Sequence, residues 1–262
     1  MGSATTQALA ASIQTLAAAK DVTLDTAREL FAAAHAVGDS SQLSGALADP
    51  AAPAAARQNV VTAVFGGLSA NTQAVLKTVV SERWSNADEL VDGIDELAIR
   101  ASTIADAGAD IEGELFGFSR VVAANPELEL ALGSRLGGQD AKSALVDRLL
   151  TGTTSAPAAL IVSSLVRQPR ERRIRQLLNR AMRIVSDQRD RVVATVYSAS
   201  ALSDAQRARL GEALSRRYDG QVALNVVIDP TIIGGLRVQI ADDVIDGSIS
   251  ARLADLRQKL AG

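Results

Sequence analysis

The sequence contains no cysteine and only one histidine, and aromatic residues make up 3% of its 262 positions. Without cysteine the chain has no disulfide and no thiolate chemistry, which is compatible with a reducing compartment. A single histidine, His35, argues against a catalytic triad or a histidine metal cluster, and we expect it in solvent or at a boundary position. Scarce aromatic residues together with abundant alanine favour closely packed helices over a β-sandwich or a barrel.

The sequence also lacks the motifs of several classes of membrane, nucleotide-binding and metal-binding protein. No run of eighteen apolar residues occurs, and the N-terminus lacks the basic flank of a secretory signal, so any membrane association is expected to run through partner proteins. A formal net charge of −3 does not suggest a general nucleic-acid binder. The chain has no Walker-type phosphate loop, no dinucleotide-binding glycine motif and no carboxylate pair with metal-ligand spacing. We therefore expect no catalytic residue, no cofactor and no bound metal.

Hydrophobic periodicity predicts a series of amphipathic helices from the N-terminus up to Asp190. Their ends are marked by Thr23 as an N-cap, Pro53 in a first turn and Gly66-Gly67 as a stop. Trp84 ends one of these helices and is expected to pack in the core or at a bundle junction. The six helices expected before residue 108 cover 5–20, 23–38, a short segment around 43–47, 53–65, 71–83 and 86–108.

The first helices repeat later in the chain. A constant shift that sets Leu9 opposite Ile94 keeps one register over much of the helical region. The other matched positions are Leu30-Phe31 with Leu115-Phe116, Leu47 with Leu132, and Val75-Leu76 with Leu160-Ile161. We interpret this as an internal duplication of a helical unit, in which the long helix near 88–106 can close the first copy and open the second.

After residue 190 the period of the pattern changes from helix to strand. Alternating apolar residues predict strands at 192–197 and 222–228, joined by a helix that a capping box of Ser203 and Gln206 opens. Such a strand–helix–strand unit is expected to be parallel. Asp242-Asp243 is expected to form a hairpin turn between two further strands. A closing helix is predicted from the apolar stripe Ile249, Leu253, Leu256 and Leu260.

The segment between residues 229 and 260 carries a specific order of motifs. Gly234-Gly235 starts a strand, and Asp246-Gly247-Ser248 is a break with a helix N-cap, for which a capping role of Asp246 is favoured over a catalytic one. This order resembles the C-terminal signature of the delta subunit of F-type ATP synthase, whose mitochondrial counterpart is the oligomycin-sensitivity-conferring protein. The positions that match this signature are Gly234, Gly235, Val244, Ile245, Asp246, Gly247, Ser248, Arg252 and Leu253.

The resemblance and the residue patterns together predict an α+β fold class. We expect two tandem all-α helical bundles, duplicated and possessing about six helices each, followed by a small α/β C-terminal domain. The expected domains are 1–107, 108–190 (which can also use helix 88–106) and 191–262. The sequence departs from the family in two respects: members usually have one helical domain, and they often have an aromatic residue in the first helix that this chain lacks.

The resemblance also implies a function. The chain is expected to be a non-catalytic peripheral-stalk, or stator, subunit that joins the α subunits of the catalytic head to the b-subunit stalk and resists rotor torque. Its partners would be the N-terminal helix of an α subunit and the C-terminal helices of the b subunits. Its location would be the cytoplasmic face of the bacterial plasma membrane, held there only through the complex.

The same resemblance suggests where these partners bind. The groove for the α-subunit tail is expected between the first and fifth helices of one bundle, and which bundle is left open. In the second bundle the groove residues would be Ile94, Leu97, Leu160, Ile161 and Leu165, and in the first bundle Leu9, Ile13, Leu76 and Val79. The stalk contact is expected at Leu236, Val238, Ile249, Leu253 and Leu256.

The segment 167–191 is the sharpest charge feature, with nine arginines and three carboxylates. A solvated helix face is one interpretation, and a docking face for acidic helices of a partner is another. Nucleic-acid binding is a third, although no aromatic residues that could stack on bases are interspersed with the arginines. The alternative function is therefore a helical-repeat adaptor that binds nucleic acid or an acidic protein through this segment.

Overall fold

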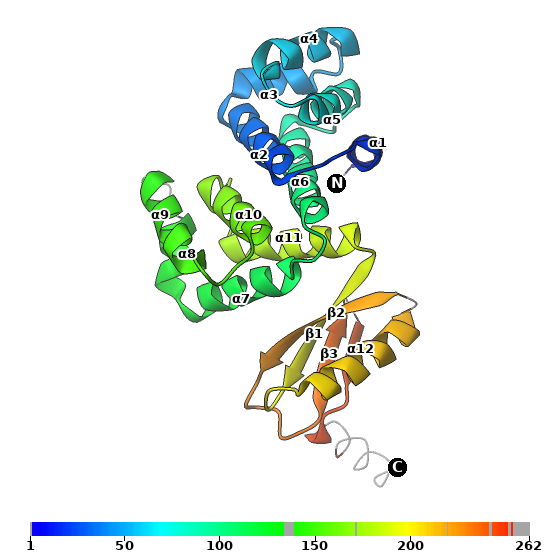
Figure 1. Ribbon diagram of the computed structural model, residues 1–262, viewed down its shortest axis with the longest axis vertical. Coiled ribbons are helices and arrows are strands. Elements are labelled where there is room, and N and C mark those ends of the chain that lie inside the picture. The colour runs from blue at the N-terminus through cyan, green and yellow to red at the C-terminus, as the bar shows by residue number, and fades with distance from the viewer. Residues whose placement is uncertain are drawn as a thin grey trace. The chain divides into compact units, whose positions relative to one another are not determined.

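The computed structural model describes residues 2–133, 139–170, 172–218, 220–240, 243–250 and 253. The chain divides into two compact units, Met1–Val185 and Ser186–Gly262, and each is described by itself. The first unit is helical, and the second combines a helix with a small mixed sheet (Figure 1). The predicted α+β fold class is confirmed. The finer division of the helical part into bundles 1–107 and 108–190 stays a prediction.

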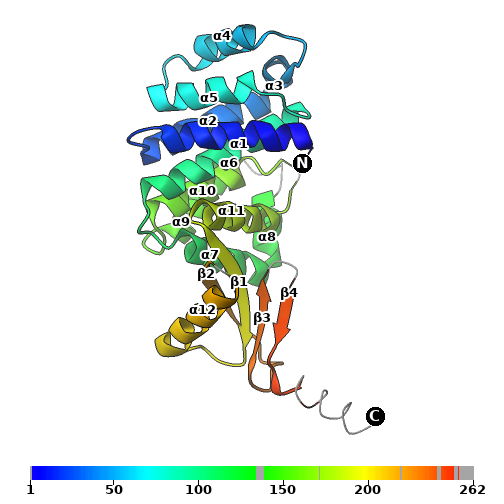
Figure 2. The ribbon, with the colours of Figure 1, turned by 90° about the vertical axis from the view of Figure 1, so that its right-hand side faces the viewer.

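The helices of the first unit follow one another through short loops, as expected from the periodicity of the sequence (Figure 2). None of the described helices is both long and apolar enough to cross a membrane. Their bounds are α1 (Ser3–Ala18), α2 (Leu24–Asp39), α3 (Ser41–Ala48), α4 (Ala54–Phe65), α5 (Ala70–Ser81), α6 (Ala87–Ala105), α7 (Ile111–Ala124), α8 (Pro126–Gly133), α9 (Gln139–Leu150), α10 (Ala156–Arg167) and α11 (Ile174–Gln188).

The helix boundaries repeat along the chain. The shift that takes Leu9 to Ile94 also relates the first and last residues of α3 to those of α8, and those of α4 to those of α9. The loop before α10 is one residue longer than the loop before α5, so the shift between the fifth helices is larger by one. Val75 therefore corresponds to Ile161 rather than to Leu160, and both are fully buried. The structure thus corrects the ungapped alignment at this point, because the extra residue in the loop before α10 shifts the alignment of every later residue by one position.

Each copy of the repeat fastens its fifth helix with a glutamate from its second helix. The carboxylate of Glu29 on α2 accepts hydrogen bonds from the backbone N–H of Ser69, at 3.1 Å, and from the hydroxyl of Thr72. Glu114 on α7, at the corresponding position of the second repeat, accepts from the N–H and the hydroxyl of Ser155 at 2.9 and 2.6 Å. Ser69 and Ser155 are the N-caps of α5 and α10. A carboxylate at a helix N-terminus satisfies free N–H groups and faces the positive end of the helix dipole.

Helix α6 lies at the centre of the first unit. All of its residues from Leu90 to Thr103 are buried, including the charged ones. It contacts α1, α2, α3 and α5 on the side of the first repeat and α10 on the side of the second. The indole of Trp84, just before α6, is also buried, and its Nε1 donates to the carbonyl of Val79 at 2.7 Å. The expected core position of Trp84 is confirmed.

The second unit is built on four strands in the order β2-β1-β3-β4. Strands β1 (Arg191–Ser198) and β2 (Gln221–Ile228) are parallel, as predicted, and are joined by α12 (Asp204–Tyr218). Strand β3 (Leu236–Ile240) runs antiparallel to β1 and to β4 (Asp243–Asp246). The predicted capping box is present, because Ser203 and Gln206 exchange side-chain-to-backbone hydrogen bonds. The core under α12 contains Ala194, Val196, Leu214, Val238 and Ile240.

Several predicted features lie outside the described residues. These are Asp242 of the hairpin turn, Arg252 of the signature, and most of the closing helix with Leu256 and Leu260. Ile249, Ser250 and Leu253 are described and are helical.

Candidate protein-binding surfaces

The residues predicted to line a groove for a partner helix lie in the core of the first unit. In the second repeat, Ile94 and Leu97 on α6 and Ile161 on α10 are fully buried. Leu165 is also buried, and only Leu160 is half-buried. In the first repeat Leu9, Leu76 and Val79 are buried, and Ile13 is half-buried. A partner helix would therefore meet the more exposed neighbours of these side chains on α1, α5 and α10.

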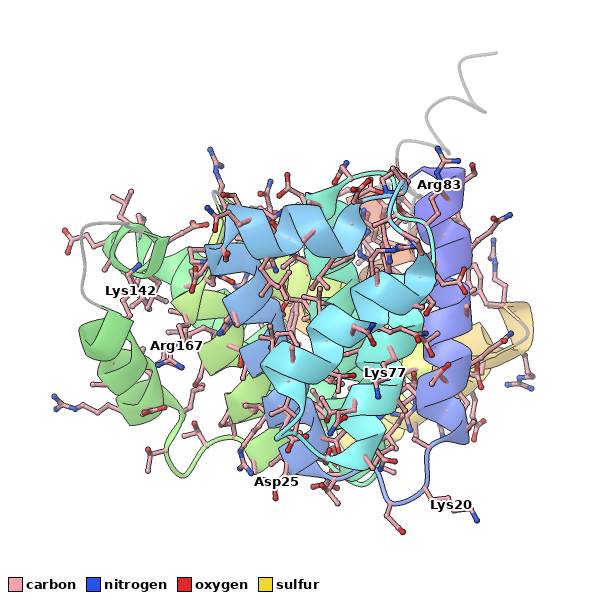
Figure 3. The ribbon with its side chains drawn as sticks, turned by 90° about the horizontal axis from the view of Figure 1, so that it is seen from above. Lys20, Asp25, Lys77, Arg83, Lys142 and Arg167 are labelled. Carbon is pink, nitrogen blue, oxygen red and sulfur yellow. The ribbon has the colours of Figure 1, made fainter. Side chains whose placement is uncertain are left out.

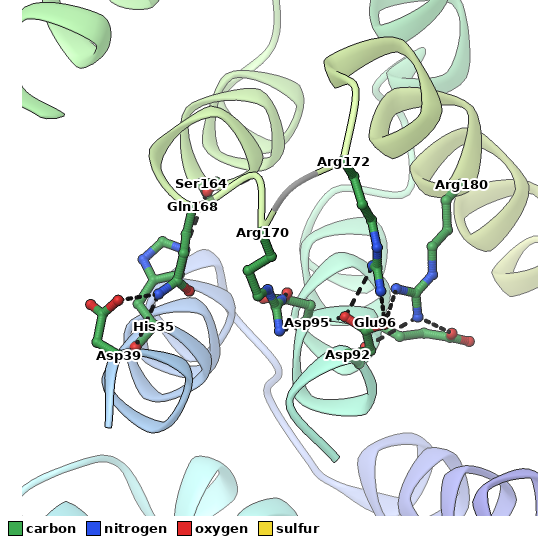
Figure 4. Close-up of polar contacts among 10 residues, drawn as sticks. All are labelled: His35, Asp39, Asp92, Asp95, Glu96, Ser164, Gln168, Arg170, Arg172 and Arg180. Carbon is green, nitrogen blue, oxygen red and sulfur yellow. Dashed lines mark hydrogen bonds and ion pairs between the residues drawn. The ribbon is translucent and has the colours of Figure 1, made fainter. Parts of the chain in front are cut away.

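Arginines after α10 cover the carboxylates of α6. Arg172 donates from Nη1 to Asp92 Oδ1 at 3.0 Å, and Arg170 forms ion pairs with Asp92 and Asp95 (Figure 4). Arg180 on α11 reaches Glu96 from Nη2 at 3.4 Å. These carboxylate side chains are only 7 to 12% exposed. Three arginines from one end of the arginine-rich segment thus neutralise three buried acids of the central helix.

This network changes the interpretation of the arginine-rich segment. Arg170, Arg172 and Arg180 are bound to α6, and Arg175 pairs with Glu129 on α8 at 3.0 Å. Hydrogen bonding to Asp92 raises the pKa of Arg172, whereas burial lowers the pKa of Arg170 and the charge of Asp92 opposes that shift. Four of the nine arginines are thus paired within the chain, and the docking of an acidic partner on this segment stays a prediction.

His35 on α2 connects the two repeats. Its Nε2 lies 3.2 Å from the carbonyl oxygen of Ser164 on α10, which places the ring proton on Nε2 (Figure 4). Gln168, just after α10, donates its amide to Asp39 at the end of α2. The ring is half-buried, so the expected boundary position of this histidine is confirmed. Burial, followed by the nearby charge of Arg167, lowers the pKa of His35.

One face of the first repeat is open. Helix α1 exposes a stripe formed by Thr6, Gln7, Ala10, Gln14 and Ala17, which are all small or uncharged. Helix α5 packs against α1, and on it Ala74 is exposed and Lys77 is half-exposed (Figure 3). The hydroxyls of Thr15 on α1 and Thr78 on α5 are hydrogen bonded at 3.1 Å and close the seam between the two helices.

The signature of the second unit is a backbone clasp. Gly235 has φ +80°, and a Cβ atom there would lie 2.4 Å from the carbonyl oxygen of Gly247. Gly247 N–H donates to Leu236 O at 2.8 Å, and Ile249 N–H donates to Gly234 O at 3.0 Å. These contacts hold the segment after β4 against the start of β3. Glycine is required at 235 because no other residue tolerates both the left-handed conformation and the close approach.

The side chain of Asp246 closes the same turn. Its Oδ1 accepts a hydrogen bond from the N–H of Ser248 at 2.9 Å. Hydrogen bonding from Ser248 also lowers the pKa of Asp246. The geometry therefore fits the expected capping role, and Ile245 and Ser248 of the signature face the interior of the unit.

The predicted stalk contact is divided between buried and exposed residues. Val238 is buried under α12, so its side chain is not available for direct contact with a partner. Leu236 lines a cleft of about 480 Å³ together with Ser200, Arg209 and Gly235. Ile249 and Leu253 are 47% and 50% exposed. Leu256 lies outside the described residues.

Sequence reasoning missed one residue of this surface. Ile233 is 78% exposed, and the adjacent Gly234 lies against the Ile249 side chain, because a Cβ there would be 2.9 Å from its Cδ1. We call Ile233, Ile249 and Leu253 the C-terminal apolar patch. A β-branched residue before two glycines gave no periodic signal that could have marked Ile233 as exposed. Among the described residues no group of three or more potential ligand side chains could hold a metal ion.

Comparisons with known proteins agree with one another. The profile of the family described as ATP synthase delta (OSCP) subunit matches residues 98–260. A protein named ATP synthase subunit delta from Leifsonia xyli is 47% identical, and the alignment covers 100% of both chains. Proteins of the same name from Streptomyces avermitilis and Nocardia farcinica are 39% and 38% identical, covering 98% and 94% of this chain and 98% and 93% of their own.

One solved structure is also similar in part. A chain from the Toxoplasma gondii mitochondrial ATP synthase hexamer matches 64% of this chain and 97% of its own length, with 16% identity and a TM-score of 0.35. A likeness at that level does not establish a common fold.

Proposed function

The chain belongs to the ATP synthase delta (OSCP) subunit family, and from that premise we propose that it is a non-catalytic subunit of the peripheral stalk of a proton-translocating F-type ATP synthase. In this role it joins α subunits of the catalytic head to the b-subunit stalk and resists the torque of the rotor. The observation that carries the proposal is similarity to delta subunits along the whole chain, at 47% identity for the relative from Leifsonia xyli.

The physical features of the chain support a connecting role. Three large apolar side chains of the second unit, which we grouped as the C-terminal apolar patch, are exposed. Exposed apolar groups close together are typical of sites that bind other proteins. We propose that this patch holds the C-terminal helices of the b subunits, and that a helical repeat of the first unit holds the N-terminal helix of an α subunit.

The location of the protein follows from the same proposal. A subunit of this kind would sit at the cytoplasmic face of the bacterial plasma membrane and be held there through the complex. The alternative function, an adaptor that binds nucleic acid or an acidic protein through residues 167–191, is not favoured. Four of the nine arginines in that segment, Arg170, Arg172, Arg175 and Arg180, are bound to acidic residues of the chain itself.

Two measurements test the proposal. The full chain with an affinity tag should copurify with the α and b subunits from membranes of its native cell, and its absence from the isolated synthase would reject the proposed function. In a binding assay with the C-terminal peptide of the b subunit, Leu253→Asp should weaken affinity at least about ten-fold, because it places a charge in an apolar contact.

The matched control is Val64→Asp on α4. Val64 is 51% exposed, which is nearly the same as Leu253, but it belongs to the first unit. This variant should bind the b-subunit peptide like the parent protein. Equal loss of affinity in both variants would mean that the effect is not specific to the C-terminal apolar patch.

A further inference from the structure

The two outer strands of the sheet in the second unit differ in length and charge. Strands β2 and β4 form opposite edges of this sheet (Figure 2). Strand β4 has four residues, and an aspartate stands at each of its ends, Asp243 and Asp246. Strand β2 has eight residues, and its sequence, QVALNVVI, contains no charged residue and no proline. Short length and charged side chains protect a sheet edge from pairing with another chain, so β4 is protected and β2 is not.

The direction of the backbone groups of β2 follows from its pairing with β1. At the end of β2, the N–H of Asp229 donates to the carbonyl of Ser198 on β1 at 2.8 Å. Backbone groups of successive residues in a strand point to opposite sides, so every second residue counted back from Asp229 also faces β1. The N–H and C=O groups of the other residues point to the outer side, where no described residue pairs with β2. These outward-facing residues are Val222, Leu224, Val226 and Ile228.

Asn225, in the middle of β2, is a buried polar residue without a partner for its side chain. It is 5% exposed, and among the described residues its side-chain amide has no hydrogen-bond partner. An amide has an acceptor oxygen and two donor N–H groups, and leaving them unpaired in a buried position costs free energy. Because β2 is an edge strand, Asn225 lacks the neighbour that a further strand would place beside it. A strand on the outer side of β2 can therefore supply the missing hydrogen bonds.

A second copy of β2 brings a suitable group to that position. When two β2 strands lie antiparallel and all the outward-facing residues take part, Leu224 of one copy faces Val226 of the other. Val222 then faces Ile228, and a two-fold axis passes between the two copies of Asn225. The two asparagines form a pair without backbone hydrogen bonds, in which the Cα atoms are about 4.5 Å apart and the side chains are closest. Their amides can then donate hydrogen bonds to each other.

Self-complementarity favours a second copy as the occupant of this edge. Since β2 carries no charge, two identical strands meet without like charges opposite each other. The register of full overlap is also the one that brings the asparagines together, and any shift both shortens the ladder and separates the amides. We propose that the β2 edge joins the four-stranded sheets of two copies of this chain into one continuous sheet. The inference concerns the chain on its own and does not depend on the proposed function.

The extent of the contact indicates how stable this dimer is. A single pair of edge strands buries much less surface than the roughly 1,600 Å² of a standard protein–protein interface. We therefore expect monomer and dimer to be in an equilibrium that depends on protein concentration.

Cysteine cross-linking tests the register, because the chain has no cysteine of its own. Asn225→Cys places both thiols at the two-fold axis, where the Cα separation of about 4.5 Å is within the range of a disulfide. Ala223→Cys, on the same face of β2, is the matched control, because its two copies would lie about 14 Å apart along the strands. After mild oxidation of the full-length proteins, Asn225→Cys should give at least about ten-fold more disulfide-linked dimer than Ala223→Cys. Equal yields, or no dimer from Asn225→Cys, would overturn the inference.

Sedimentation velocity tests the edge without a cross-link. Ile228 on β2 and Val244 on β4 are both 54% exposed and lie on opposite edges. Ile228→Lys places a charge in the contact between the copies and should raise the dissociation constant of the dimer at least about ten-fold, whereas Val244→Lys should dimerise like the parent. Circular dichroism shows whether each variant is folded. A parent that stays monomeric up to millimolar concentration, equal effects of the two lysines, or a loss confined to Val244→Lys would contradict the proposed dimer.

Discussion

The indole ring of Trp84 fills the space beside Gly93, so that a Cβ atom on residue 93 would lie 2.2 Å from Cη2 of the ring. The ring is fixed on its other edge, because its Nε1 donates to the carbonyl of Val79. Trp84 comes from the turn before α6 and Gly93 from its second turn. A glycine inside a helix is thus explained by close packing rather than by a bend.

Gly93→Ala should destabilise the first unit. The new methyl group forces the buried indole to move, and overpacking of this kind costs about 1–3 kcal/mol of unfolding free energy. The change is measured by urea unfolding followed by tryptophan fluorescence, which reports only this unit because the chain has one tryptophan. Gly117→Ala on α7 is the control, because nothing lies near its Cβ position, and it should be neutral or stabilising. Equal midpoints for both variants would refute the packing argument.

Local patterns predicted much of this fold. The strands around Val196 and Val226, the capping box at Ser203 and the repeat register at Leu30 and Leu115 depend on residues close in sequence or on a constant shift. Each of these signals can be read within one helix or strand, or from one alignment of the chain with itself.

The candidate site was harder to predict. Nothing in the sequence marks Asp92, Asp95 and Glu96 as buried, because the arginines that cover them come some eighty positions later, as the pair of Asp92 with Arg172 shows. No periodic signal joins such residues, because their pairing depends on tertiary packing. The open face of α1 was equally hidden, since its pattern differs little from that of a covered helix.

Arg170→Gln should weaken the attachment of the α10–α11 loop to α6. Arg170 is an ion-pair partner of Asp95, and their side chains are 22% and 10% exposed. Removing one member of a largely buried pair leaves an uncompensated charge, and with this partial exposure we expect a loss of about 2–3 kcal/mol. Thermal or urea unfolding measures the change.

A double-mutant cycle isolates the interaction of Arg170 with Asp95. Asp95→Asn added to Arg170→Gln should cost less than the sum of the single changes, because the stranded carboxylate is then absent. Arg28→Gln breaks the exposed pair with Asp25 and should change stability by no more than about 0.5 kcal/mol. Additive effects of the two substitutions at 95 and 170 would show that the pair is not coupled.

Glu29 should make the free energy of unfolding decrease at acidic pH. Burial alone would raise its pKa, but hydrogen bonds from Ser69 and Thr72 outweigh that effect and lower it. A carboxylate with a lowered pKa stabilises the fold above its ordinary pKa, and the contribution disappears as the pH falls through the folded-state value. Glu29→Gln should therefore reduce stability at pH 7 and have less effect near pH 3. An identical difference between parent and variant at both pH values would contradict the capping role.

His35 should produce a separate pH dependence at milder acidity. Its lowered pKa, caused first by burial and then by Arg167, means that the unfolded chain takes up a proton before the folded one. Arg170 acts in the same direction, whereas Asp39 and the carbonyl of Ser164 oppose it. Stability should thus decrease as the pH falls below about 6.5. His35→Gln should flatten the curve between pH 7.5 and pH 5.5, and an unchanged slope would exclude His35 as its source.

Gly235→Ala should unfold the clasp of the second unit while the first unit stays intact. Residue 235 combines φ +80° with a Cβ position 2.4 Å from a backbone oxygen, which cannot move away as a side chain could. The left-handed conformation alone costs a residue other than glycine about 1–2 kcal/mol, and the clash adds to it.

Both tyrosines, Tyr197 and Tyr218, lie in this unit, so tyrosine fluorescence should show a lower midpoint while the tryptophan transition is unchanged. Gly211→Ala on α12, whose Cβ would meet only Leu224 at 3.8 Å, is the matched control and should leave both transitions in place. A parent-like tyrosine transition in Gly235→Ala would mean that the double glycine is needed for contact with a partner and not for the fold.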